Sequence, residues 1–160
     1  MRKSLRREFI DLLGAEKVTY SPEDLVAYSY DGYTAEHIPD LVVFPECMLS
    51  GYAYESREEA LPHAISIDDP TFAELVGAAV KHQLHLTVGF LAKNGTRLFN
   101  ASALVGPDGV IGQYRKIHLP HLGIDRFVDR GDIPYEVHAA GSVNVGMAIC
   151  YDSSFPEPMR

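Results

Sequence analysis

Three residues with reactive side chains stand at the ends of predicted strands. Glu46 follows the apolar stretch "DLVVFP", Lys116 ends "GQYRK", and Cys150 ends "VGMAIC". A thiol attacks carbon as a thiolate, so it needs a nearby base or cation. A carboxylate can accept the thiol proton, and an ammonium can favour the thiolate and bind an oxyanion. The three side chains together suffice for acyl transfer through a thioester, with no metal and no organic cofactor.

Each of these residues also has an ordinary structural interpretation. A lone cysteine at a strand end is most often a small buried hydrophobe. A glutamate after a strand is usually a solvated turn residue or a cap, and a lysine beside an arginine in a β-rich segment is usually surface charge. Residue types and positions by themselves therefore permit a thiol enzyme without requiring one.

The elements that must position these residues alternate between strands and helices. Strands are predicted over residues 40–44, 84–91, 96–106, 110–117 and 142–150, and a helix over 68–83. Asp69 is the expected N-cap of that helix, whose apolar positions Phe72, Leu75, Val76 and Ala79 follow helical spacing. Pro107-Asp108-Gly109 predicts a hairpin turn. This order predicts a mixed α/β sheet with helices on its faces, and reactive side chains gathered at the carboxyl ends of its strands.

Three segments that contain these residues resemble one known family. "LVVFPECMLSGY", "GQYRKIHLP" and "VGMAICYDSSFPE" are similar, in this order and spacing, to the three signature segments of the nitrilase superfamily of carbon–nitrogen hydrolases. The resemblance covers about residues 39–160. It implies a nitrilase-type α-β-β-α sandwich, here partial, that acts on a small amide, carbamoyl or nitrile substrate through a cysteine thioester.

The resemblance also implies a role for each reactive residue. Glu46 is the general base and Cys150 the nucleophile, while Lys116 and the backbone N–H of Tyr151 stabilise the oxyanion. Many members of the family carry a second catalytic glutamate at the position that Gly123 occupies here.

Asp125 is the candidate to take the place of that second glutamate. Together with Tyr52 and Tyr151, it is also predicted to bind substrate. For Tyr52, packing in the core or at the rim of the pocket is an equal alternative.

The N-terminal part of the chain has a different character. Residues 1–38 are predicted to form a helical appendage, and residues 39–160 a nitrilase-like domain that is incomplete at its C-terminus. Residues about 10–45 resemble the N-terminus of FAD-linked glycolate or lactate oxidases. Because the flavin-binding segments of those oxidases do not follow, we predict no flavin. The chain is interpreted as a fragment or a chimera whose activity is impaired by truncation.

Composition narrows the classes of partner. Of the 160 residues, 46% are apolar and 22% charged, which is ordinary for a soluble globular protein. A net charge of −8 disfavours nucleic acid as a partner, and no apolar run approaches the ~20 residues of a membrane span. Two cysteines are too few for a disulfide framework, and no secretory signal is recognised, so a cytoplasmic location is expected.

Histidine pairs raise the question of a metal site. His118 and His121, with Asp125, have a spacing that could hold a metal, as do His82 and His85. The spacing helps only on a helix, and Pro120 interrupts the first pair while His85 begins a predicted strand. Surface or hydrogen-bonded histidines are therefore favoured over a metal site.

A different class of function is kept as the alternative. It is a non-catalytic α/β module, or chimeric fragment, that self-associates through exposed sheet edges. An unreactive Cys150 in a defined oligomer would favour the module, and a thioester on Cys150 would favour the enzyme. Under either interpretation we expect a homo-oligomer, because half a sandwich exposes an apolar face.

Overall fold

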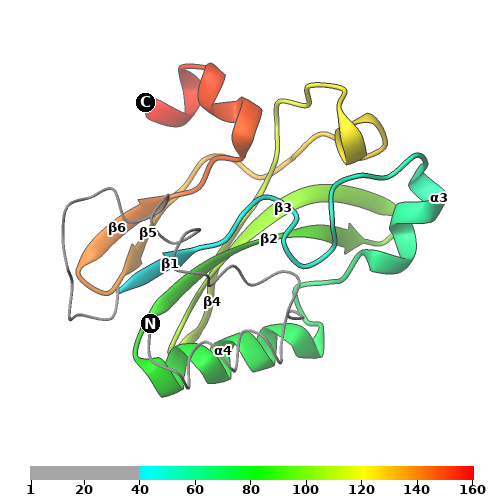
Figure 1. The fold of residues 1–160 in the computed structure, drawn as a ribbon. Coiled ribbons are helices and arrows are strands. Elements are labelled where there is room, and N and C mark those ends of the chain that lie inside the picture. The colour runs from blue at the N-terminus through cyan, green and yellow to red at the C-terminus, as the bar shows by residue number, and fades with distance from the viewer. Residues whose placement is uncertain (1–39) are drawn as a thin grey trace, which may run out of the picture. The chain divides into compact units, whose positions relative to one another are not determined.

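The structure, a computed structural model, describes residues 40–160. A four-stranded mixed sheet forms the centre of this part of the chain (Figure 1). β1 (Leu41–Val43) runs parallel to β2 (His85–Asn94), and β2, β3 (Arg97–Gly106) and β4 (Gly109–Arg115) follow in antiparallel pairs. β1 and β4 therefore point the same way, and the segments that follow them leave the sheet at the same end, although the two strands lie at opposite edges. The predicted mixed α/β sheet is confirmed, while the helical appendage predicted over residues 1–38 lies outside the described residues.

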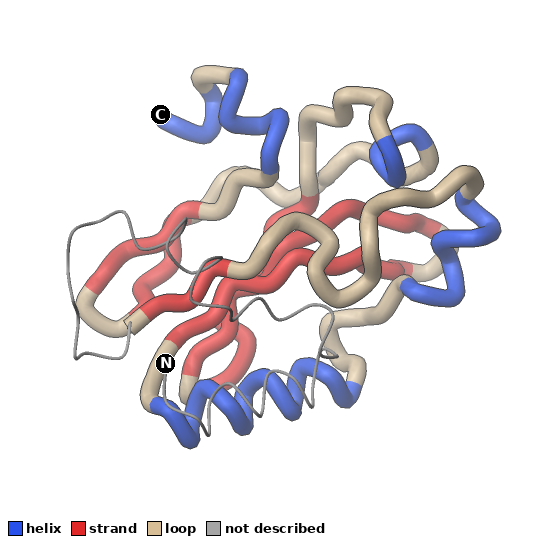
Figure 2. Tube along the Cα trace, in the orientation of Figure 1, coloured by secondary structure: helices blue, strands red, loops and turns tan. Residues whose placement is uncertain are grey.

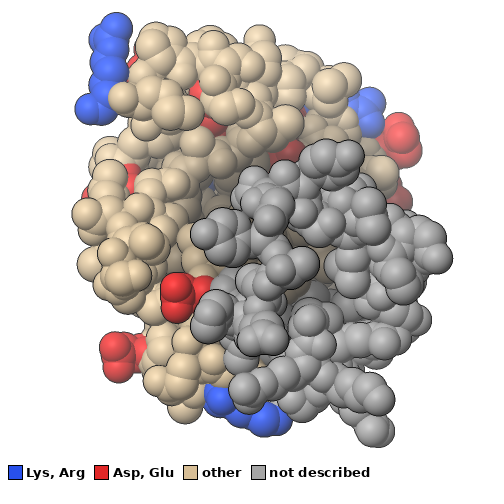
Figure 3. Space-filling model, turned by 60° about the vertical axis from the view of Figure 1, so that its left-hand side comes forward, with Lys and Arg blue, Asp and Glu red and all other residues tan. Residues whose placement is uncertain are grey.

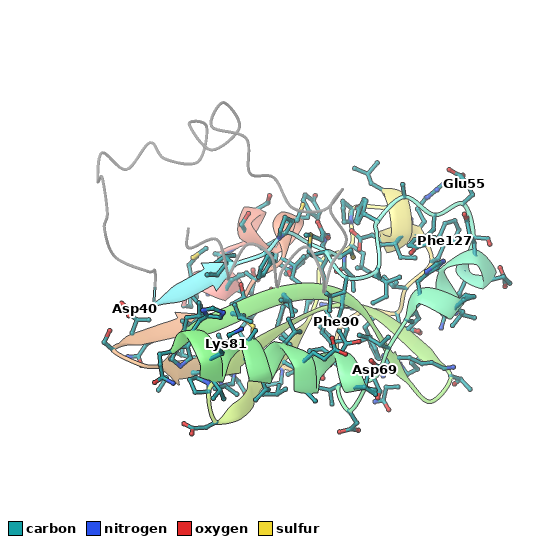
Figure 4. The ribbon with its side chains drawn as sticks, turned by 60° about the horizontal axis from the view of Figure 1, so that its bottom comes forward. Asp40, Glu55, Asp69, Lys81, Phe90 and Phe127 are labelled. Atoms are coloured by element: carbon teal, nitrogen blue, oxygen red, sulfur yellow. The ribbon has the colours of Figure 1, made fainter. Side chains whose placement is uncertain are left out.

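The predicted helix over 68–83 is α4 (Pro70–His82), which packs on one face of the sheet (Figure 1). Its buried residues Phe72, Leu75 and Ala79 are three of the four apolar positions expected to face the core. The Phe72 ring meets Phe90 of β2 edge-on, with ring centroids 5.0 Å apart. Figure 4 places Phe90 between the sheet and α4. Burial of this apolar stripe is what holds α4 to the sheet.

The hairpin turn at Pro107-Asp108-Gly109 is also confirmed. Gly106 of β3 lies opposite Gly109 of β4, so two residues connect the strands. Gly109 has a φ of +126°, which only glycine adopts without strain. The turn sets the register of β4 at its start, and a one-residue register shift between Leu104 and Val105 then determines where Lys116, the residue after β4, leaves the sheet.

Short elements and loops make up most of the remaining chain (Figure 2). α3 (Arg57–Ala60) and the 3₁₀ helix η2 (Leu61–His63) lie between β1 and α4. η3 (Gly123–Arg126) follows β4, and β5 (Val137–Ala140) pairs with β6 (Val143–Gly146) in a separate two-stranded ladder. η4 (Cys150–Ser154) and η5 (Glu157–Met159) end the chain.

Two strand predictions require correction. The strand over 40–44 was expected to be buried, but β1 spans three residues at the edge of the sheet and Val43 is 71% exposed. The last strand was expected to run to Cys150, but β6 stops at Gly146 and Cys150 opens η4. The chain turns because the Ile149 N–H donates to the Asp152 carboxylate, 3.2 Å away, instead of to a neighbouring strand.

The N-cap of α4 provides a test of local stability. Asp69 Oδ1 accepts hydrogen bonds from the Thr71 backbone N–H at 3.0 Å and the Thr71 hydroxyl at 2.7 Å, and these bonds lower the pKa of the Asp69 carboxyl. We expect Asp69→Ala to lower the free energy of unfolding by about 1 kcal/mol in urea titrations at neutral pH. The loss should shrink as the pH falls through the lowered pKa, because protonation removes the same bonds.

The neighbouring exposed residue supplies the control. Asp68→Ala removes a carboxylate one position earlier and should leave the unfolding midpoint nearly unchanged. Equal effects of the two substitutions would contradict the cap assignment.

None of the helices in residues 40–160 is both long enough and apolar enough to cross a membrane.

Candidate active site

A buried lysine joins two carboxylates at the end of the sheet where β1 and β4 finish. Lys116 Nζ lies 2.6 Å from Glu46 Oε1 and 2.6 Å from Asp125 Oδ2. The side chains of Lys116 and Asp125 are fully buried, and that of Glu46 is mostly buried. Burial by itself lowers the pKa of Lys116, but its hydrogen bonds to Asp125 and Glu46 outweigh burial and raise the pKa. The lysine is therefore a fixed cation at any physiological pH.

Local backbone geometry places Glu46 at this point. Pro45 ends β1, and Cys47 has a left-handed backbone with a φ of +53°. The turn lies directly on β2 at Gly89, where an added Cβ would come within 2.4 Å of the Cys47 nitrogen and 2.5 Å of the Pro45 oxygen. Close approach of two backbones is possible because Gly89 has no side chain.

Asp125 occupies a place in the cluster that the sequence left open. Gly123, at the position of the family's second glutamate, has a φ of +48°, and a Cβ there would come within 2.3 Å of the Tyr52 ring. The Tyr52 hydroxyl lies 2.9 Å from the Leu122 carbonyl oxygen and 3.0 Å from Asp125 Oδ2. The second carboxylate of the cluster thus comes from Asp125, with Tyr52 packed over Gly123.

The backbone at Cys150 turns sharply. Cys150 has a φ of +47°, a left-handed conformation that is uncommon for residues other than glycine. The buried Asp152 carboxylate holds the turn: it accepts the Ile149 N–H at 3.2 Å, the Tyr114 hydroxyl at 2.8 Å and the His118 N–H at 2.9 Å. Since His118 follows Lys116 by two residues, Asp152 ties the turn that carries Cys150 to the loop that carries Lys116.

Glu46 and Cys150 line one cavity of about 200 Å³. Its other lining residues are mainly apolar and come from the β1 and β2 strands and from the segment before Cys150, among them Leu41, Val43, Gly89, Met147 and Ile149. Lys116, Asp125, Tyr52 and Tyr151 are not among the lining residues. Lys116 and Asp125 lie buried behind Glu46, and Tyr151 is exposed with its ring edge-on to Phe155. Substrate contact by Tyr52, Tyr151 and Asp125 therefore stays a prediction.

The environment of Cys150 raises the pKa of its thiol. Burial is the largest cause, and the negative charge of Glu46 and a hydrogen bond to Glu46 add to it. Lys116 and a hydrogen bond from the Tyr151 backbone N–H act in the opposite direction, as the sequence analysis expected of a cation, but they are outweighed. Partial burial of the thiol, in a residue that is otherwise exposed, and the nearby Glu46 charge together outweigh the Lys116 ammonium.

Cys47 differs from Cys150 in burial more than in chemistry. It is 1% exposed and its thiol donates to Asn100 Oδ1 at 3.4 Å. Burial, followed by the charges of Glu46 and Asp125, raises its pKa strongly. Cys47 therefore packs behind the segment that carries Glu46.

Iodoacetamide should distinguish the two thiols. Cys150 is exposed, so we expect it to be labelled in the native chain while Cys47 stays unlabelled until the chain unfolds. Because the pKa of Cys150 is raised, its labelling rate should keep increasing with pH beyond the ordinary thiol value of about 8.5. Peptide mass spectrometry of a labelling time course measures both rates, and equal labelling of the two thiols would refute this assignment.

Two residues of the site were not recognised from the sequence. Asn100 and Asp152 are both buried and polar, and both bond to the segments that carry the reactive residues. An asparagine within the apolar strand "LFNASALV" was the available signal for Asn100. Asp152 follows Cys150 in a polar stretch, and nothing in that pattern indicates burial.

The histidines that raised the question of a metal site include His118, which has a clear hydrogen-bond partner. His118 Nδ1 lies 2.9 Å from Asp152 Oδ1, and its ring stacks on Phe155 with centroids 3.7 Å apart. Across residues 40–160, no group of three or more histidine, cysteine, aspartate or glutamate side chains is placed to hold a metal ion. The geometry of His118 is that of a hydrogen-bonded histidine.

Comparison with known proteins identifies the family. Residues 27–160 match the carbon–nitrogen hydrolase family. The chain belongs to this family. It is 39% identical to a nitrilase of Pyrococcus abyssi over 121 residues, which are 75% of this chain and 46% of that protein. It is 36% identical to an (R)-stereoselective amidase of a Pseudomonas species, over 76% of this chain and 43% of that protein.

The fold agrees with that of solved carbon–nitrogen hydrolases. A superfamily protein from Xanthomonas campestris, whose structure has an arsenic adduct in the active site, matches with a TM-score of 0.63 and 27% identity. The match covers 73% of this chain and 43% of that chain. The predicted nitrilase-type fold class is therefore confirmed, and the chain spans about half the length of the curated relatives that it matches. These comparisons give no support to the predicted resemblance to FAD-linked oxidases, and the family match itself begins within that segment.

Proposed function

We propose that this carbon–nitrogen hydrolase domain cleaves a small amide, carbamoyl or nitrile substrate through a thioester on Cys150. The observation that carries the proposal is Glu46, which lines a cavity with Cys150, lies close enough to its thiol to raise the pKa of that thiol, and lies 2.6 Å from the buried Lys116 ammonium. A thiol with a raised pKa is protonated at rest, so attack needs a base in contact with it. Glu46 is placed to be that base.

In the proposed reaction on an amide, Glu46 carries a proton from the thiol to the leaving group. Glu46 accepts the Cys150 proton as the sulfur–carbon bond forms, and the developing oxyanion is stabilised by hydrogen-bond donors. The carbon–nitrogen bond then breaks, and Glu46 passes the proton to the leaving ammonia or amine. Water, deprotonated by Glu46, hydrolyses the thioester to a carboxylic acid and restores the thiol.

Two donors are assigned to the oxyanion in this proposal. The Tyr151 backbone N–H lies next to the Cys150 sulfur, and the oxyanion would form on the substrate oxygen once the substrate carbon bonds to that sulfur. The Lys116 ammonium has three N–H bonds, and Glu46 and Asp125 use two of them. Lys116 is not among the cavity-lining residues, so we assign it first the role of pairing with the Glu46 carboxylate and holding it in place.

The cavity supports a small substrate. Its volume of about 200 Å³ lies below the roughly 300–1,000 Å³ of pockets for drug-sized ligands. In Figure 3 the Lys, Arg, Asp and Glu side chains on the described surface that faces the viewer are scattered over it. The lining of the cavity itself is mainly apolar. A short, uncharged acyl or nitrile group suits these surroundings.

Covalent capture tests the proposal. The chain is incubated with simple amides, N-carbamoyl compounds and nitriles, quenched in acid, and examined by intact-protein and peptide mass spectrometry, while released ammonia is measured. We expect an acyl mass on Cys150, no adduct with Cys150→Ala, and a loss of about 100-fold or more in adduct formation with Glu46→Gln. Glu58→Gln, an exposed glutamate of α3, is the matched control and should behave like the unaltered chain.

The alternative function predicts the opposite outcome. If Cys150 forms no adduct with any substrate while the chain is folded, the hydrolase proposal fails and a non-catalytic module is favoured. Self-association, which remains a prediction, is measured separately by light scattering at micromolar concentration. Large exposed apolar side chains in residues 40–160, such as Val43 and Val137, are its motivation.

A further inference from the structure

We infer that Asn100 is a positioning residue that bridges the Glu46 and Asp125 carboxylates and orients Glu46 toward Cys150. The inference rests on the proposed role of Glu46 as proton acceptor. Asn100 lies within β3 and is 1% exposed. Its amide nitrogen donates to Glu46 Oε1 at 2.6 Å and to Asp125 Oδ1 at 2.8 Å.

The hydrogen-bond inventory of an amide matches this position. An asparagine amide nitrogen has two hydrogens, and here each is directed at a different carboxylate. Its oxygen accepts the Cys47 thiol at 3.4 Å, which fixes the orientation of the amide. A flipped amide would place its oxygen against two carboxylates, so the orientation is also the one that electrostatics requires.

Asn100 also reaches the third charged residue. Its backbone carbonyl oxygen accepts the backbone N–H of Lys116 at 2.8 Å. One residue of β3 is therefore bonded to the glutamate, the aspartate and the lysine of the cluster. These elements meet only in the folded chain, and Asn100 sets the spacing between them.

Charge explains why an amide, and not a carboxylate, is needed here. Two carboxylates share one lysine, so the cluster already has one more negative than positive charge. A neutral donor gives each carboxylate a hydrogen bond without adding to that charge. The bonds from Lys116 and Asn100 both end on Glu46 Oε1, so the carboxylate is anchored through one oxygen.

The test uses an isosteric change that reverses the electrostatics. Asn100→Asp keeps the shape but replaces two donors with a carboxyl group facing two carboxylates. We expect the pH midpoint for iodoacetamide labelling of Cys150 to rise by about one unit or more, because added negative charge opposes thiolate formation. Asn94→Asp, at an exposed position at the end of β2, should leave the midpoint unchanged.

A compensating variant separates electrostatics from packing. Asn100→Asp combined with Asp125→Asn restores the net charge and again sets one amide against one carboxylate. The labelling midpoint should return at least halfway, and the double variant should remain measurable if the single one unfolds. The role of Asn100 would be overturned if the labelling midpoint of Asn100→Asp equalled that of the Asn94→Asp control. It would also be overturned if the double variant kept the raised midpoint of Asn100→Asp. The assay uses no substrate, so a chain that hydrolyses nothing still gives a result for Asn100.

Discussion

Replacing Gly89 with alanine is expected to displace Glu46 and abolish most of the proposed activity. The new Cβ would lie within 2.4 Å of the Cys47 nitrogen, 2.5 Å of the Pro45 oxygen and 2.9 Å of the Glu46 carbonyl carbon. All three are backbone atoms, so no side chain can move aside. Overpacking of this kind costs ~1–3 kcal/mol in stability. Misplacement of a catalytic group by ~1 Å costs ~100-fold in rate.

A second glycine supplies the matched control. Gly77 lies on the exposed side of α4, and a Cβ there meets no atom within 4 Å. Gly77→Ala should stabilise the chain by up to ~1 kcal/mol, because alanine is the better helix former. Urea unfolding and the rate of adduct formation on Cys150 measure both effects. A Gly89→Ala chain with unchanged stability and adduct rate would show that the segment around Glu46 can shift freely.

Replacing Lys116 with methionine is expected to be the most destabilising single change in the site. Methionine has a similar length but no charge, so Glu46 and Asp125 would face each other without a cation. Removing one partner of a buried ion pair costs ~3–5 kcal/mol, a large part of the ~5–15 kcal/mol that stabilises a typical domain. Lys93→Met, at an exposed position of β2, should change stability by less than ~0.5 kcal/mol in the same urea titration.

Two further measurements identify the cause of that loss. Lys116→Met combined with Asp125→Asn should recover part of the stability, since one unpaired charge is removed with its partner. The penalty of Lys116→Met should also shrink at acidic pH, where protonation of a carboxylate ends the repulsion. In the unaltered chain the pKa of Lys116 is raised, so its contribution is complete below the ordinary lysine pKa and is lost only as the pH rises through the raised value. A loss that neither the second substitution nor acid reduces would point to packing instead of charge.

Local pattern predicted the regular elements well. Asp69, Pro70 and the apolar spacing of α4 are read within one segment, and the β3–β4 turn depends on Pro107, Asp108 and Gly109 alone. Predictions failed where the outcome depended on distant residues. β6 ends at Gly146, opposite Val137 where its partner β5 begins, the Ile149 N–H further on bonds to Asp152 and not to a strand, and β1 is exposed because it lies at a sheet edge. The hydrophobic periodicity and the composition of a segment do not show which distant groups compete for its backbone hydrogen bonds.

The sequence by itself determined the family, and it predicts Glu46, Lys116 and Cys150 as the reactive residues, because these residues stand in short motifs whose letters and order are specific. Only the tertiary structure decided how their charges are balanced. Asp125 pairs with Lys116, Asn100 bridges Glu46 and Asp125, and Tyr52 fills the space beside Gly123. These contacts join β3, the segment after β1 and the loop after β4, so they exist only once the sheet has set its register. A pKa, too, depends on burial and on charges within a few Å, and so the raised pKa of Cys150 is a property of the fold and not of the motif.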